Sequence, residues 1–111
     1  MARRSEPDPL AEKVGARIRA LREATGLTLE QLAYSCDFSK GQLSTIERGL
    51  AVPTASTLNT LAEGLGVLPL DLLTFPDDGP RERLVNLTRY LSKTEMEAVL
   101  ALLRHRAPQS A

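Results

Sequence analysis

The chain has 111 residues, enough for one compact domain with a short additional segment, and its 14 basic side chains equal its 14 acidic ones in number. With zero net charge, any nucleic-acid-binding face has to come from the distribution of charge and not from a basic excess. The single cysteine, Cys36, excludes an internal disulfide, and no apolar stretch approaches the roughly 20 residues that a membrane-spanning helix needs.

The N-terminal part of the sequence predicts a polar arm followed by a helix. Residues 1–8 are polar, so we expect a flexible arm. Asp8 is suited to cap a helix and Pro9 to occupy its first position. An apolar stripe follows at helical spacing: Val14, Ile18 and Leu21. We therefore expect a helix over residues 9–24, ended by Gly26.

Two capping boxes begin eleven residues apart. In each, a Ser or Thr side chain and a Gln three residues later satisfy each other's backbone donors, first at Thr28 and Gln31, then at Ser39 and Gln42. They predict two short helices separated by a tight turn at residues 37–38.

Glycine and proline mark the ends of the next elements. Gly49 ends the third helix, and Thr54 caps a fourth that ends at Gly66. Pro69 begins a short fifth helix. The core must come from Leu, Ile, Val and Ala, because aromatic residues make up only 4% of the chain. This composition favours helix packing over sheets.

A helix, a tight turn and a second helix form the helix-turn-helix, whose second helix enters the major groove of DNA. Residues 26–49 resemble this element in the Cro/CI-type (XRE-like) regulator family. The positions in register are Gln31, Leu32, Ala33, Ser39, Leu43, Ser44, Ile46, Glu47, Gly49 and Pro53. The resemblance implies an all-α fold, with a lambda-repressor-like domain of five helices at residues 9–75.

The resemblance also implies which residues touch DNA. Base edges are expected to be read by Lys40, Gly41, Ser44 and Thr45, with a phosphate as the alternative acceptor for Lys40. Phosphates are expected at Thr28, Gln31, Ser39, Arg48 and Thr54. The plainer alternatives are a solvated helix face for the first set and ordinary helix caps for the second. Gly41 either lets DNA approach the backbone closely or is merely tolerated.

Glu47 is an acidic residue on a helix that approaches DNA. In the family this position pairs with an arginine of the first helix, which here is Arg22, so we expect a partly buried ion pair that orients the third helix. Asp37 stands where many members have glycine, and we expect it to adopt the left-handed conformation.

Residues 9–75 contain six basic and seven acidic side chains, which implies modest affinity for DNA of arbitrary sequence. A dimer, the arm with Arg3 and Arg4, or both would then be needed for binding. That arm either reaches a minor groove or is simply disordered.

The C-terminal residues 80–106 lie outside the resemblance and predict a two-helix hairpin. One helix is expected over residues 81–91, and the other begins with a capping box at Thr94 and Glu97. The apolar positions are Leu84, Leu87, Leu91, Val99, Leu100 and Leu103. They must pack on the same hairpin of a second copy, on the first domain, or on another protein. We favour dimerisation.

The sequence therefore predicts a homodimeric, sequence-specific transcriptional regulator that binds double-stranded DNA in the cytoplasm, at the nucleoid. The alternative is a protein-interaction module, such as an antitoxin or accessory subunit, with weak DNA binding. Catalysis is not expected, because Cys36 and His105 belong to distant elements and no phosphate-binding or metal-binding motif is present. We expect no cofactor and no metal.

Overall fold

The computed structural model describes residues 6–106 and 108. In this described part the chain forms seven α-helices and one short 3₁₀ helix, which confirms the expected all-α fold. None of these helices combines the length and the apolar character needed to cross a membrane. The chain divides into two compact units, residues 1–75 and residues 76–111. Residues 1–5 of the expected arm, with Arg3 and Arg4, lie outside the described residues.

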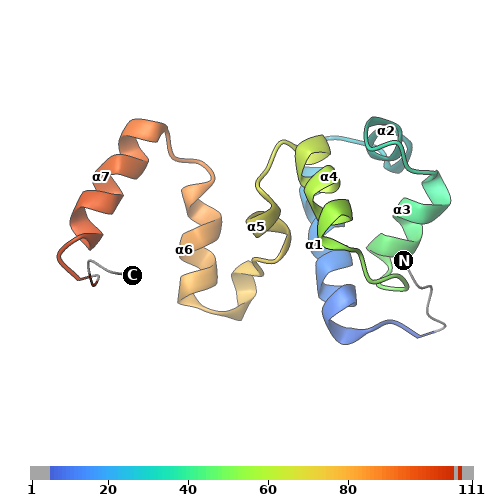
Figure 1. Cartoon of the computed structure of the whole chain (residues 1–111), viewed down its shortest axis with the longest axis horizontal. Helices are drawn as coiled ribbons and strands as arrows, with labels where there is room; N and C mark the ends of the chain where they lie inside the picture. Colours follow the sequence, from blue (N-terminus) through green and yellow to red (C-terminus); the bar gives the residue numbers. More distant parts are fainter. Residues whose placement is uncertain (1–5, 107, 109–111) are drawn as a thin grey trace. The chain divides into compact units, whose positions relative to one another are not determined.

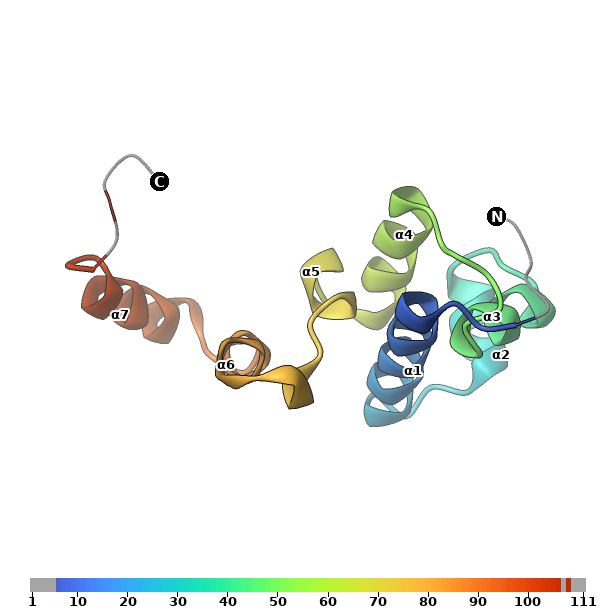
Figure 2. The same ribbon diagram turned by 90° about the horizontal axis from the view of Figure 1, so that it is seen from below.

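The first unit contains five helices, as expected: α1 (Pro9–Ala24), α2 (Leu29–Ser35), α3 (Lys40–Glu47), α4 (Ala55–Leu65) and α5 (Pro69–Leu72). Asp8 caps α1 by accepting a hydrogen bond from the backbone N–H of Ala11 at 3.0 Å, and proline stands at the start of the helix. Within this unit, α2 and α3 lie on one side of α1 and α5 lies on the other, in Figure 1 and again in Figure 2.

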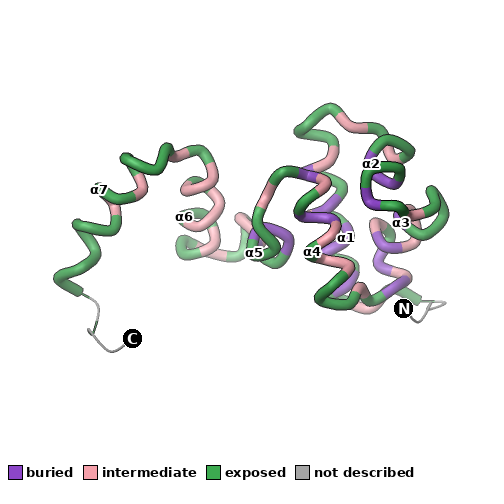
Figure 3. Tube along the Cα trace, turned by 45° about the horizontal axis from the view of Figure 1, so that its top comes forward, coloured by how far each residue is buried: buried purple, intermediate pink, exposed green. Residues whose placement is uncertain are grey.

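The core of the first unit is aliphatic and receives side chains from all five helices. Its least exposed large residues are Ile18, Leu32, Leu43, Ile46, Leu61 and Leu72. Each such side chain contributes about 1.5–3 kcal/mol when it leaves water. The buried stretches lie where the helices face one another (Figure 3). The expected stripe on α1 is confirmed, because Val14, Ile18 and Leu21 are all buried.

Two glycines let α1 and its start approach α3 closely. A Cβ atom on Gly15 of α1 would lie 2.3 Å from the carbonyl oxygen of Ile46, inside van der Waals contact. Gly49, which follows the C-cap residue of α3, has a φ of +76°, and a Cβ there would lie 2.6 Å from the Cα of Glu12. The C-terminal end of α3 is therefore fixed against α1 by backbone contact.

The second unit contains a 3₁₀ helix, η1 (Pro76–Asp78), and two α-helices, α6 (Pro80–Thr88) and α7 (Lys93–Leu103). None of its described residues is buried. The helix expected to reach residue 91 ends at Thr88, so Leu91 lies in the connection between α6 and α7. The expected pair of helices is present, and the contacts inside this unit run mainly between η1 and α6.

The prediction for the start of α7 was wrong. The cap is Ser92, whose hydroxyl accepts from the N–H of Glu95 at 3.1 Å while the Glu95 carboxylate accepts from the N–H of Ser92 at 2.9 Å. Thr94 and Glu97 have the same spacing but lie inside the helix. Two overlapping capping boxes satisfy the same sequence pattern, and the helix begins at the earlier one.

Candidate nucleic-acid interface

The turn between α2 and α3 has the geometry that the sequence predicted. Both capping boxes form: Thr28 Oγ1 accepts from the N–H of Gln31 at 3.1 Å, and Ser39 Oγ accepts from the N–H of Gln42 at 3.0 Å. In return each glutamine side chain accepts from the N–H of its cap. Asp37 has a φ of 57°, the left-handed conformation expected for it. The start of α3 is thus defined by local hydrogen bonds.

The two sides of α3 differ sharply in polarity. Leu43 and Ile46 point into the core and are essentially fully buried. The outward side borders an open hollow of about 420 Å³. Its lining consists of Ser39, Gly41, Gln42, Ser44, Thr45, Arg48 and Ala51. Five residues expected to touch DNA, from both predicted sets, therefore line one hollow.

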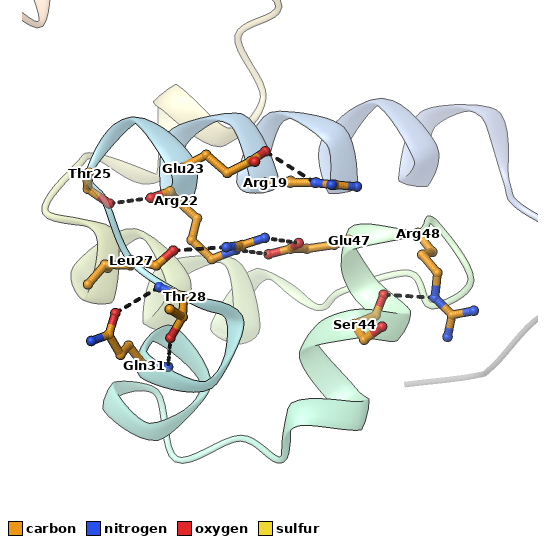
Figure 4. A network of polar contacts seen from close by, with 10 residues as sticks. All are labelled: Arg19, Arg22, Glu23, Thr25, Leu27, Thr28, Gln31, Ser44, Glu47 and Arg48. Carbon is orange, nitrogen blue, oxygen red and sulfur yellow. Dashed lines mark hydrogen bonds and ion pairs between the residues drawn. The ribbon is translucent and has the colours of Figure 1, made fainter.

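Small polar groups and backbone dominate this hollow. A Cβ on Gly41 would have no neighbour closer than the Ser39 hydroxyl oxygen at 3.9 Å, so the fold itself does not require glycine there. Thr45 Oγ1 donates to the carbonyl oxygen of Gly41 at 2.8 Å. The guanidinium of Arg48 reaches back to the carbonyl oxygen of Ser44 at 3.4 Å (Figure 4). The hydroxyls and the guanidinium can form hydrogen bonds with the base edges in the major groove of DNA, and the open backbone leaves room for the bases to approach.

Lys40, at the start of α3, has a partner that sequence reasoning missed. Its Nζ lies 2.7 Å from the carboxylate of Glu30 in the first turn of α2, and both side chains are well exposed. The hydrogen bond from Lys40 lowers the pKa of Glu30 below its usual value. The pairing joins two helices, so no spacing within either helix reveals it.

The expected ion pair between α1 and α3 is present. Arg22 Nε and Nη2 donate to the two carboxylate oxygens of Glu47 at 2.8 and 3.0 Å, and Nη1 donates to the carbonyl oxygen of Leu27 at 2.9 Å (Figure 4). The two side chains are only 12% and 6% exposed. The hydrogen bond to Glu47 raises the pKa of Arg22 further. The guanidinium therefore joins α1, the loop before α2, and α3.

The remaining residues expected at phosphates are helix caps outside the hollow. Thr28 and Gln31 form the cap of α2, and Thr54 caps α4 by accepting from the N–H of Thr57 at 3.1 Å. Thr28, Gln31 and Thr54 are all exposed. Their contact with phosphate stays a prediction.

Comparison with known proteins decides the family. Residues 13–74, more than half of the chain, match the sequence model of the family described as helix-turn-helix domain. An HTH-type transcriptional regulator of Sinorhizobium fredii is 42% identical over 67 residues, which make up 60% of this chain and 87% of that protein. The chain belongs to the helix-turn-helix transcriptional regulators.

Solved structures agree with this assignment. The regulator ClgR from C. glutamicum superposes with a TM-score of 0.57 and 37% identity, over 61% of this chain and 87% of that one. SinR, a master regulator for biofilm formation solved in complex with DNA, superposes with a TM-score of 0.52 and 34% identity, over 54% of this chain and 97% of that one. The expected family and the DNA-binding regulatory function are confirmed, and the protein-interaction module is not favoured. The second unit of this helix-turn-helix regulator lies beyond residue 74, outside the family match.

Proposed function

We propose that this regulator reads specific DNA sequences with the outward side of α3 in the major groove. The observation that carries the proposal is the polar hollow along that side, opposite the buried Leu43 and Ile46. Lys40 would donate to a guanine edge, and the hydroxyls of Ser44 and Thr45 would bond to base edges. Gly41 keeps the helix surface low, so that DNA can approach the backbone.

The caps around α3 are proposed to face the phosphates that flank the groove. Thr28 and Gln31 of α2, Ser39 of α3 and Thr54 of α4 stand at exposed helix starts, where backbone N–H groups and the helix dipole favour anions. Arg48 is exposed at the end of α3 and is proposed to add a charged phosphate contact.

We further propose that the regulator acts as a homodimer joined through its second unit. None of the unit's described side chains is buried. Helices that present apolar side chains and bury none of them need a further surface to pack against. The proposed interface consists of Leu84, Leu87, Leu91, Val99, Leu100 and Leu103. Two copies would place two α3 helices on half-sites about 34 Å apart.

No catalytic role is proposed. Cys36 is buried in the core, where burial raises its thiol pKa, and its Sγ donates to the carbonyl oxygen of Thr60 at 3.6 Å. Such a thiol is a poor nucleophile. Because the relatives from S. fredii and C. glutamicum are bacterial regulators and the proposed ligand is DNA, we propose that the protein works in the cytoplasm, at the nucleoid.

Selection of bound sequences from a random DNA pool tests the proposal. We expect an inverted repeat with half-sites about one helical turn apart, and affinity that falls as salt rises. Lys40→Ala should weaken binding to the selected site. Arg19→Ala is the matched control, because Arg19 forms an equally exposed ion pair with Glu23 on α1. Failure to enrich any sequence, even at low salt, would overturn sequence-specific recognition.

A further inference from the structure

Lys40 and Glu30 form a charge pair on the surface that is proposed to face DNA. The ammonium lies 2.7 Å from the carboxylate, across the gap between the starts of α3 and α2. The side chains are 64% and 59% exposed, so neither is held by the core. A phosphate arriving at this surface meets an ammonium that a carboxylate already neutralises.

This neutralisation matters because α3 and its C-cap carry only two cationic side chains, Lys40 and Arg48. Phosphate neutralisation by Lys and Arg supplies the affinity that does not depend on sequence. Pairing with Glu30 neutralises Lys40, so only Arg48 of these two side chains keeps an unpaired positive charge for phosphate.

The effect on a base edge differs from the effect on a phosphate. An ammonium group has three donors, and the bond to Glu30 uses one of them. Two donors stay available for a pair of acceptors such as guanine N7 and O6. A phosphate contact depends on the net positive charge of the ammonium, and the Glu30 carboxylate reduces that charge. The same pairing therefore weakens contacts to phosphate more than contacts to bases.

We propose that Glu30 is a specificity-determining residue that competes with phosphate for Lys40 and keeps Lys40 directed to base edges. The inference rests on the proposed function of α3. By this inference Glu30, which lies in α2 and not in α3, lowers the affinity of the protein for DNA of arbitrary sequence.

The test compares wild type, Glu30→Gln, Lys40→Ala and the double variant on the selected site and on a scrambled duplex, at two salt concentrations. Glu30→Gln should raise affinity for the scrambled duplex about two- to fivefold, the range expected for release of one exposed ion pair. For the same variant and duplex, the slope of log binding constant against log salt concentration should become more negative by about 0.9, the change expected for one added phosphate contact. Affinity for the selected site should stay unchanged, so the specificity ratio falls by the same factor.

Glu23→Gln is the matched control, because it removes one negative charge from an ion pair of the same exposure on α1. It should leave the specificity ratio unchanged. In the Lys40→Ala background, Glu30→Gln should have no further effect on the scrambled duplex. Thermal unfolding checks that each variant is folded.

Three results would overturn the inference: an equal rise on both duplexes, no change on either, or a Glu30→Gln effect that persists without Lys40. A wild-type protein with no sequence preference would instead overturn the proposed function. In that case the salt slope on the scrambled duplex still decides whether Glu30 neutralises Lys40.

Discussion

Arg22 joins three segments of the first unit through one guanidinium. Two of its nitrogens bond to the Glu47 carboxylate and a third to the Leu27 carbonyl oxygen, all within 3.0 Å. The planar fork of arginine fits this arrangement, whereas the single ammonium of a lysine cannot form the two parallel bonds to the carboxylate. Since both charged side chains are largely shielded from water, each depends on the other for its partner.

We expect Glu47→Ala to lower the free energy of unfolding by about 3 kcal/mol, because it leaves the guanidinium largely buried and without its charged partner. Urea denaturation measures the change. Glu23→Ala is the control: it breaks the exposed pair with Arg19 and should cost less than about 1 kcal/mol. Equal costs for the two variants would mean that the Arg22–Glu47 pair is no more than a surface contact.

The substitution Gly41→Ala, which adds a single methyl group, tests whether DNA binding requires glycine at this position. The space at its Cβ position is open, with the nearest atom 3.9 Å away, and alanine favours helix by about 0.5–1 kcal/mol over glycine. Gly41→Ala should therefore raise the unfolding free energy by up to that amount. It should also weaken binding to the selected DNA site, because the methyl group enters the hollow along α3. Higher stability with unchanged binding would show that glycine is merely tolerated there.

At the scale of elements, Gly15 lies at the contact between α1 and α3, and its Cβ position is blocked, in contrast to the open Cβ position of Gly41. Gly15→Ala places a methyl carbon 2.3 Å from the Ile46 carbonyl oxygen, so the two helices must separate. We expect a loss of about 1–3 kcal/mol in unfolding free energy, the usual cost of overpacking. With Gly41→Ala as its partner, the experiment compares two helical Gly→Ala changes with opposite expected signs. A stabilised Gly15→Ala protein would contradict the observed packing.

These elements also show how far the sequence alone reaches. The caps Asp8, Thr28, Ser39 and Thr54 were predictable because capping depends on residues within one turn. The stripe on α1 was predictable because helical periodicity is local. The overlapping boxes near Ser92 were not, since two equivalent local patterns compete and only the helix start differs.

Relations between helices were accessible only where the family resemblance supplied them. It supplied the Arg22–Glu47 pair, and the structure contains it. Nothing in the sequence indicates that Gly15 faces the backbone of α3, or that Glu30 reaches Lys40, because each relation depends on how two helices meet in space. The hollow along α3 likewise arises from residues whose individual identities suggest only a polar face.

At the scale of the whole molecule, the first unit has a buried hydrophobic core, whereas no described residue of the second unit is buried. The first unit buries aliphatic side chains from five helices. The second exposes six large hydrophobic side chains in its described residues: Leu84, Leu87, Tyr90, Leu100, Leu102 and Leu103. Four of these side chains, Leu84, Leu87, Leu100 and Leu103, belong to the dimer interface proposed above, which would cover them.

We expect the Leu84→Glu, Leu100→Glu double variant to convert a dimer into a monomer in sedimentation experiments. The two leucines are each 51% exposed, and Leu100 lies on the α7 stripe with Val99 and Leu103. Leu102→Glu is the control, because Leu102 is 76% exposed and lies off that stripe, so it should leave the dimer intact.

The same double variant should lose most of its affinity for an inverted repeat while binding a single half-site as the wild type does, because α3 belongs to the other unit. A double variant that still dimerises would place the interface elsewhere. A wild-type protein that sediments as a monomer would mean that these leucines pack on the first unit or on a different protein. Either result would leave the reading of base edges by α3 intact, since half-site binding depends on one copy of the first unit.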